Sequence, residues 1–350
     1  MNSPRLAKQS LSHSTLLESW NRSLWAAIAM TLSLTAGTVR AQDDEPVDGA
    51  ALVGDWSLDL PNNQAGCLTV EKTEDGLQPI LLWAVGSPEK IDEFEFDGDS
   101  LLFLKKIPRP LAPRDEIAKT YSIQMMAHED TLYGVMAAGN ELTEFTGKRQ
   151  PPLPEKPDLS KIEFGEPIEL FNGRDLTGWS NHGPGTINGW SGRDGILRND
   201  TPKTDFSAYG EYANLKTDDA FGDFQLHIEY RLPEAGGNSG IYLRGMYEVQ
   251  VTHRGNGRVS KGGPGALYGR ILPTKNAGHP AGQWDVYDIT LVDRHVTIVL
   301  NGETIIDNQP IVGCTGGALQ SDVTADGPLM LQGDHTTVEY RNIVLRPRVE

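Results

Sequence analysis

The chain has 350 residues, a formal net charge of −17 and a hydrophobic content of 38%. This length favours two domains, and the apolar content is sufficient to form a core in each of them. The negative charge argues against nucleic acid as a partner, because an acidic protein repels phosphate backbones. The 38 glycines and 22 prolines indicate many turns, and few segments keep a helical period. We therefore expect a mostly β structure.

Residues 1–41 have the pattern of a bacterial-type secretory signal. A polar, mildly basic segment precedes an apolar stretch at residues 24–39, which is too short and too interrupted for a good membrane span. Val39-Arg40-Ala41 then precedes the expected cleavage site before Gln42. We expect an exported mature chain, periplasmic or extracellular, without a transmembrane segment. The alternative is an N-terminal anchor that stays uncleaved.

Residues 42–149 are predicted to form a small antiparallel β barrel or sandwich. Short alternating segments separated by turn clusters indicate strands at residues 56–60, 68–73, 80–85, 91–96, 101–105, 120–125, 131–135 and 142–146. The opening Gly54-x-Trp56 resembles that of lipocalin-like barrels. A binding or spacer role is expected here. An apolar ligand inside the barrel is an alternative that a filled interior would exclude.

A proline-rich linker is predicted at residues 150–161, because four prolines between Gln150 and Pro157 stiffen the chain. The linker separates the first domain from a second one at residues 162–350, and we expect the two to fold independently. Cys67 and Cys314 lie in different domains and give no zinc-binding spacing. They are interpreted as small buried hydrophobes in preference to an interdomain disulfide.

The stretch 236–250 is predicted to carry the functional face of the second domain. It has the pattern of two strands joined by a turn at Gly245-Met246. Alternation assigns one set of side chains to the core: Ile241, Leu243, Val249 and Val251. It assigns the other set to one exposed polar face: Tyr242, Arg244, Glu248 and Gln250. Such a face suits a polyhydroxylated ligand. The glycine-rich and basic stretch 252–275 is expected to form a long loop over the sheet.

Several motifs occur in an order that resembles the 3-keto-disaccharide hydrolase domain family. The most specific are residues 238–244 with 247–250, and residues 332–335 followed by 339–343. The resemblance covers about residues 165–348 and implies a concanavalin A-like jelly-roll sandwich with a glycan-facing sheet. It also implies cleavage of glycosides already oxidised at C3. Thr336 stands where the family usually has Gly, which is expected to alter the turn beside His335, and Asp285 stands where Asn is usual.

The chemistry implied by this resemblance depends on the ketone. A ketone at C3 acidifies the proton on C2, so a base can remove that proton while the group at C1 leaves. Water then adds to the resulting enone. Such a site needs a base, a cation or metal that polarises the ketone, and an acid for the leaving oxygen. Ordinary glycosidases instead place two carboxylates around an oxocarbenium-like centre.

Three residues are the catalytic candidates. Glu248 is expected to act as the base or as a metal ligand, and an ion pair with Arg244 that only organises the sheet is an equally weighted alternative. His335 is a second base or ligand, and Arg244 would polarise the ketone or hold a hydroxyl. The substrate-binding candidates are Tyr242, Gln250, Asn238, Asp334 and Arg341. For Asn238, stabilisation of the glycine-rich turn is preferred over a sugar contact.

Carboxylates with one or two histidines suit a divalent ion such as Ca²⁺ or a transition metal, but no motif identifies the metal. Trp179, Trp190 and Trp284 are assigned to the core in preference to stacking on sugar rings. The preferred function is an exported enzyme that cleaves the glycosidic bond of 3-keto-glycosides or 3-keto-disaccharides by elimination or net hydrolysis. A non-catalytic carbohydrate-binding module is the alternative, and it requires no base near C2.

Overall fold

The structure, a computed structural model, describes residues 48–107, 119–183, 185, 187–202, 211–253 and 258–349. The predicted signal segment and its cleavage site lie outside these residues. Val47–Glu350 is one compact unit made of β-strands and short 3-10 turns at Ala50–Leu52, Pro61–Asn63 and Leu159–Lys161. The predicted all-β class is confirmed. No helix within the described residues is long and apolar enough to span a membrane.

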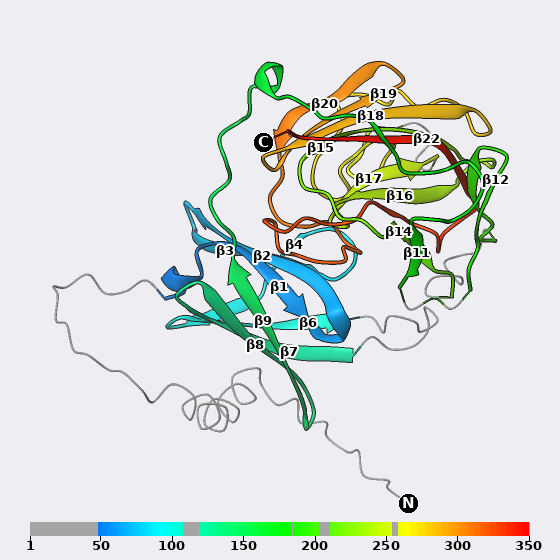
Figure 1. Cartoon of the computed structure of the whole chain (residues 1–350). Helices are drawn as coiled ribbons and strands as arrows, with labels where there is room; N and C mark the ends of the chain where they lie inside the picture. Colours follow the sequence, from blue (N-terminus) through cyan, green and yellow to red (C-terminus); the bar gives the residue numbers. More distant parts are fainter. Residues whose placement is uncertain are drawn as a thin grey trace, which may run out of the picture. The chain divides into compact units, whose positions relative to one another are not determined.

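The first sheet of the described chain has nine antiparallel strands (Figure 1). They are β1 (Gly54–Leu60), β2 (Gln64–Thr73), β3 (Gly76–Trp83), β4 (Glu89–Lys90), β5 (Phe94–Asp97), β6 (Ser100–Ile107), β7 (Lys119–His128), β8 (Thr131–Ala138) and β9 (Glu141–Arg149). Chain neighbours from β1 to β4 and from β5 to β9 pair in turn, and β1 also pairs with β9. Each strand predicted here is present, and β4 is an additional short one. The expected barrel is incomplete, because β4 and β5 are the two ends of the strand order.

Side chains fill the inside of this first sheet. Trp56, Leu58, Leu68 and Ile123 are fully buried in one apolar cluster, as alternation along a half-buried strand predicts. Trp56 also donates a hydrogen bond from Nε1 to the Leu52 carbonyl oxygen, 2.8 Å away. Within the described residues, these side chains fill the interior of the first sheet. A filled interior argues against the alternative of an apolar ligand there.

The second domain is a sandwich of two antiparallel sheets (Figure 1). The eight strands of the larger described sheet are β10 (Ile168–Glu169), β12 (Trp190–Arg193), β13 (Ile196–Asn199), β15 (Phe224–Arg231), β18 (Trp284–Val292), β19 (His295–Leu300), β20 (Glu303–Pro310) and β22 (Val338–Pro347). The five strands of the smaller one are β11 (Trp179–His182), β14 (Asn214–Thr217), β16 (Asn238–Leu243), β17 (Tyr247–Thr252) and β21 (Met330–Leu331). The predicted jelly-roll sandwich is thus present.

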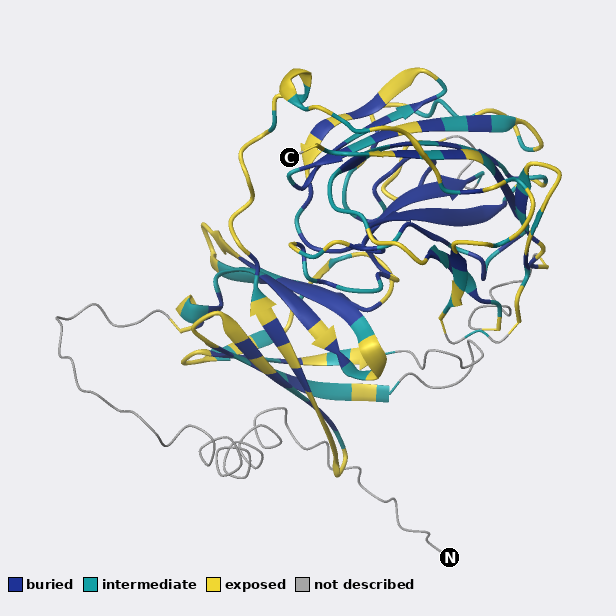
Figure 2. Cartoon of the chain, viewed as in Figure 1, coloured by how far each residue is buried: buried dark blue, intermediate teal, exposed yellow. Residues whose placement is uncertain are grey.

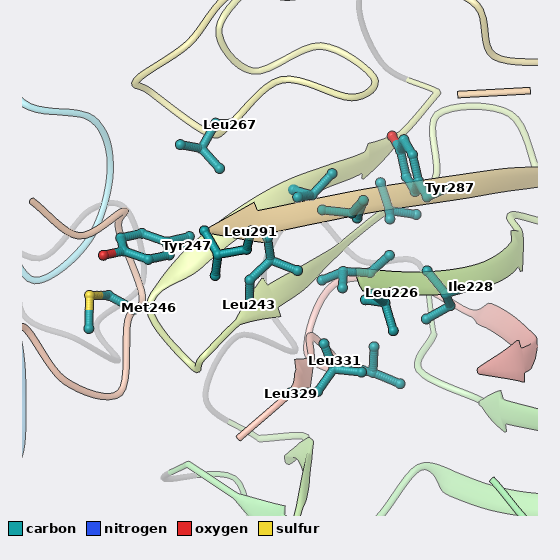
Figure 3. Packing of buried hydrophobic residues seen from close by; sticks show 14 of the residues in the cluster. Leu226, Ile228, Leu243, Met246, Tyr247, Leu267, Tyr287, Leu291, Leu329 and Leu331 are labelled. Atoms are coloured by element: carbon teal, nitrogen blue, oxygen red, sulfur yellow. The ribbon is translucent and has the colours of Figure 1, made fainter. Parts of the chain in front are cut away.

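The core of the second domain lies between these two sheets. Figure 3 shows Leu226 and Ile228 of β15 approaching Leu243, Leu331 and their neighbours from the smaller sheet. Strict alternation explains the pattern, because every second residue of β15 is buried and the others are only partly so. Core packing therefore uses one face of β16 and β17 and leaves their other face for the polar side chains.

The first sheet and the second domain share part of this core. Strand β2 is buried on both faces: Leu68 belongs to the first cluster, whereas Ala65 and Cys67 belong to the cluster of the second domain. Ser321 donates a hydrogen bond from Oγ to the Leu58 carbonyl oxygen at 3.0 Å. A chain beginning near Ser160 would lose these partners, so independent folding of the two domains stays a prediction.

Candidate active site

The predicted functional face is built on the hairpin of β16 and β17. Their register places Tyr242 opposite Glu248 and Gly240 opposite Gln250, as alternation predicts. The turn occupies residues 244–246, one residue more than expected, because β16 ends at Leu243. Arg244 and Gly245 both have left-handed backbone angles, with φ of 55° and 62°. The hairpin was therefore predicted correctly, and its turn was placed one residue too late.

Four polar side chains lie on the face of this hairpin that points away from the sandwich core: Asn238, Tyr242, Glu248 and Gln250. Gln250 donates a hydrogen bond from Nε2 to Asn238 Oδ1 at 2.6 Å. Asn238 thus belongs to the polar face and not to the glycine-rich turn. The structure brings Tyr242, Glu248 and Gln250 together, as predicted, and adds Asn238 to them.

The expected exposure of this face is wrong. Figure 2 shows β16 and β17 buried along their length, and Tyr242 and Glu248 are only 2% and 3% exposed. The segment 315–317 contributes to the cover, since the Tyr242 hydroxyl donates to the Gly316 carbonyl oxygen at 2.9 Å. Thr315 Oγ1 also accepts a hydrogen bond from the backbone N–H of Glu248 at 2.9 Å. The site is a buried polar cluster instead of an open surface.

Gly240 provides the space that the Glu248 carboxyl occupies. A Cβ atom at Gly240 would lie 2.4 Å from Glu248 Oε1 and 2.9 Å from its Cδ. Atoms at that separation overlap severely, so the carboxyl lies where a side chain at Gly240 would otherwise be. The Glu248 side chain can therefore take this position only because residue 240 is glycine. Glycine in a strand interior is ordinarily unfavourable.

Burial changes the acidity of Glu248. Removal of the carboxylate from water raises the pKa of Glu248 to about 8. The hydrogen bond with Tyr242 acts in the opposite direction, and the Asp334 carboxylate raises the pKa further. Glu248 is consequently protonated for the most part at neutral pH.

Asp334 and His335 lie in the loop after β21, and the pairing of β21 with β16 brings that loop to the hairpin. His335 Nδ1 is 2.6 Å from Asp334 Oδ1, a separation that fixes the orientation of the imidazole ring. Side-chain exposure of His335 is 11%, against 3% for the whole of Glu248. The histidine is therefore nearer to solvent than the carboxyl group.

Thr336 tethers this loop to the start of β16. Its Oγ1 accepts a hydrogen bond from the Asn238 N–H and donates one to the Asn238 carbonyl oxygen, each at 2.9 Å. A glycine at this position, which the family usually has, would lack both hydrogen bonds. The sequence departure thus adds a connection between the His335 loop and the polar face.

Arg244 does not join the polar face, contrary to the prediction. Its guanidinium donates to main-chain oxygens, with Nη2 3.0 Å from Val323 O and Nε 3.1 Å from Ala325 O. The ion pair between Arg244 and Glu248, the equally weighted alternative to a catalytic Glu248, is not formed among the described residues. The physical reason is the early end of β16, because a residue in the left-handed turn no longer follows strand alternation.

Arg341 also lies away from the site, on the outer face of the larger sheet. Its Nε donates to Glu229 Oε2 at 2.7 Å, and its guanidinium stacks over the Trp284 ring, 4.1 Å from the centroid. Arg231 packs over the same ring at 4.7 Å. The core assignment was therefore wrong for Trp284, whereas Trp179 and Trp190 are buried in the core as predicted.

Solved structures offer several likenesses. A candidate glycosyl hydrolase from Parabacteroides distasonis ATCC 8503 is 30% identical over 57% of this chain and 94% of that one, with a TM-score of 0.42. Another from the same organism is 21% identical over 52% of this chain and 100% of that one, with a TM-score of 0.40. A carbohydrate-binding module from Bacillus subtilis is 10% identical over 50% of this chain and 98% of that one, with a TM-score of 0.32. No curated protein matches the chain.

The sequence of the second domain identifies its family. Residues 166–346, just over half of the 350 residues, match the 3-keto-alpha-glucoside-1,2-lyase-like domain. The chain belongs to the 3-keto-alpha-glucoside-1,2-lyase-like domain family. The resemblance seen in the motifs is thereby confirmed, and the matched range contains the hairpin and the His335 loop of the candidate site.

Sequence reasoning missed several residues that shape the site of this lyase-like domain. Residues 265–268 run beside β17, where Gly265 N donates to Gln250 O at 3.0 Å and Tyr268 N donates to Glu248 O at 2.9 Å. The predicted loop at 252–275 therefore covers the edge of the hairpin over this part. Gly240, Thr315 and Gly316 were also missed. The glycine pair at 316–317 marks a tight turn in the sequence, and it was the signal that could have pointed to the segment over Tyr242.

A metal centre has no complete ligand set in the described part of the lyase-like domain. No group of three or more His, Cys, Asp or Glu side chains there is placed to hold a metal ion. The sequence left the metal open, and no catalytic step is assigned to one here. Asp285, the other departure from the family, is fully buried and accepts hydrogen bonds from His279 N and Asn301 Nδ2 at 2.8 and 2.6 Å.

A cavity of about 240 Å³ lies beyond the end of β17. Thr252, His253 and Asp285 are among the residues that line it, whereas Glu248 and His335 do not. The chemistry-bearing residues and this cavity are therefore separate features, and we place the candidate active site at Glu248.

Proposed function

We propose that the protein cleaves the glycosidic bond of 3-keto-glycosides by removing the C2 proton and eliminating the group at C1. The observation that carries the proposal is the buried Glu248 carboxyl, whose pKa is raised to about 8, beside the Asp334–His335 pair. Family membership supports the same reaction class. A proton donor beside a proton acceptor is what a concerted removal and donation of protons requires.

His335 is assigned the role of base. Asp334 Oδ1 lies 2.6 Å from His335 Nδ1, and in the tautomer that donates a proton from Nδ1 to this carboxylate, Nε2 is the basic nitrogen of the ring. In the reaction Nε2 takes the proton from C2, and the electrons of that C–H bond form the C1–C2 double bond. The ketone at C3 stabilises the negative charge that develops next to it.

Glu248 is assigned the role of acid, in place of the base that the sequence indicated. A protonated carboxyl can give its proton to the glycosidic oxygen as the bond between C1 and that oxygen breaks. The products of this step are an enone and a free alcohol. Addition of water across the double bond, with hydroxyl at C1 and hydrogen at C2, then completes a net hydrolysis.

The polar face supplies contacts for sugar hydroxyls. Gln250 Oε1 is buried and has no hydrogen-bond partner among the described residues. An unpaired buried acceptor is costly, so a hydroxyl donor from a ligand would stabilise it. Asn238 and Tyr242 lie on the same face, which suits a ligand with several donors and acceptors. The side-chain amides of Asn238 and Gln250 thus take the substrate-orienting role that the sequence analysis assigned to Arg244.

The pH dependence of the rate tests the role of Glu248. If Glu248 is the acid, kcat/KM for a 3-keto-disaccharide should fall above pH of about 8, roughly tenfold per pH unit. The reason is that only the protonated carboxyl can donate. A steady-state pH profile between pH 6 and 10 measures this. A rate that instead rises through pH 8 would assign Glu248 as the base and overturn the roles given above.

Export is part of the proposed function. The basic and apolar pattern of residues 1–41 supports it. The mature chain is expected to begin near Gln42. N-terminal sequencing of the protein from the periplasm or the medium tests this point, and a chain that still begins at Met1 there would contradict it.

A further inference from the structure

Two cysteines that are distant in sequence meet where the first sheet contacts the second domain. Cys67 lies on β2, and Cys314 lies between β20 and β21, yet both belong to one apolar cluster. Each thiol shifts the pKa of the other, lowering that of Cys67 and raising that of Cys314. A Cβ atom at Gly313 would lie 2.9 Å from Cys67 Sγ, which places the backbone before Cys314 directly against that sulfur.

Arg270 holds the two cysteines together. Its Nη2 is 2.7 Å from Cys67 Sγ and 2.6 Å from the Cys314 carbonyl oxygen, and its Nε is 2.9 Å from the same oxygen. A cation at this distance stabilises a thiolate, the form of cysteine that reacts with disulfides. The hydrogen bond from Cys314 lowers the pKa of Cys67 to about 6, Arg270 adds to the effect, and burial opposes it.

We propose that Cys67 and Cys314 are a covalent modification site, at which an intrachain disulfide joins the first sheet to the second domain. The oxidant is a disulfide compound, either a small molecule or a protein. Both cysteines are free in this structure and both are buried. The reaction therefore takes place while the two parts are still packing together, or when their contact opens.

The reaction is an ordinary thiol–disulfide exchange in two steps. The Cys67 thiolate attacks one sulfur of the external disulfide and releases the other sulfur as a thiolate. Cys314 then loses its proton and attacks the Cys67 sulfur, which releases the second external thiolate. Two electrons pass from the cysteine pair to the external disulfide, and two protons end on the two thiols formed from it.

The exposed linker allows a direct test in the full chain. Residues 151–156 are exposed, so a recognition site for a sequence-specific protease can be inserted between Pro154 and Glu155. The protein is refolded in a buffer of oxidised and reduced glutathione, cleaved, and run on a denaturing gel. Without reductant the two fragments should stay joined, and with reductant they should separate. Thiols titrated in denaturant should fall from two to zero per chain.

Matched variants identify the bond. In Cys67→Ser and in Cys314→Ser, the fragments should separate without reductant, and each chain should show no internal disulfide. The intact mass of the oxidised wild type should be lower by two hydrogens than that of the reduced protein. Fragments of the wild type that separate without reductant, or a mass increase from attached glutathione, would overturn the proposal. The test uses no substrate, so its outcome is independent of the proposed function.

Discussion

Replacement of Glu248 by Gln is expected to lower turnover of a 3-keto-glycoside by about 10²- to 10⁴-fold, the usual effect of losing a proton donor or acceptor. Glutamine keeps nearly the same shape but carries no transferable carboxyl proton. The buried position of Glu248 and its contact with Tyr242 support a direct role over a surface ion pair. Initial rates with a 3-keto-disaccharide measure the effect, and rates within about twofold of wild type would remove Glu248 from the mechanism.

The same variant should change the dependence of stability on pH. The pKa of Glu248 is raised from 4.5 to about 8, so between these values the folded state binds a proton that the unfolded state has lost. The free energy of unfolding contributed by this group therefore falls as pH rises from 5 to 8, by at most about 1.4 kcal/mol per pH unit. Glutamine does not ionise, so the free energy of unfolding of Glu248→Gln does not fall with pH for this reason. We expect the variant to be more stable than wild type at pH 8 by about 1–3 kcal/mol.

Urea unfolding of both proteins at pH 5, 6.5 and 8 measures this difference. Glu229→Gln is the matched control, because Glu229 lies on the outer face of the larger sheet and pairs with Arg341. That change removes a carboxylate remote from the polar face, so turnover should stay nearly unchanged. Wild-type and Glu248→Gln stabilities that run parallel with pH would show that the carboxyl is not buried as described.

Gly240→Ala is expected to lower turnover by about 10²-fold without altering any ionisable group. The new methyl would overlap the Glu248 carboxyl, with 2.4 Å to Oε1, so the carboxyl must leave its place over β16. A shift of about 1 Å in a catalytic group is enough for a loss of this size. Overpacking should also lower the free energy of unfolding by about 1–3 kcal/mol.

Gly165→Ala is the control for this glycine. A Cβ at Gly165 would meet its nearest neighbour at 3.5 Å, an ordinary contact, and the backbone there does not require glycine. Turnover and the urea midpoint should both stay close to wild type. If Gly240→Ala keeps full turnover while its crystal structure shows a displaced Glu248, the carboxyl is not needed where it lies.

The hairpin could be predicted from the sequence because its information is local. Alternating apolar and polar residues assign faces, and the short connection forces the two strands to pair, so Tyr242 and Glu248 had to meet. The prediction for Arg244 was wrong for an equally local reason. The turn takes its left-handed conformation one residue before the glycine, and alternation ends there.

The remaining site features depend on contacts between distant parts of the chain. Periodicity places Arg341 on a strand, but it does not say which sheet that strand joins, and β22 joins the larger sheet. The cover over Tyr242 comes from residues 315–317, more than seventy positions away. For the same reason the burial of β2 on both faces was missed, because the second face is covered by the other domain.

The most direct test of the proposed reaction compares two substrates that differ only at C3. The purified protein is incubated with a 3-keto-disaccharide and with the same disaccharide carrying an ordinary hydroxyl at C3, and released monosaccharides are quantified over time. We predict cleavage of the ketone at a rate at least about 10²-fold above that of the hydroxyl compound, because only the ketone acidifies the C2 proton. Equal cleavage of both compounds, or binding of the ketone without any cleavage, would contradict the account.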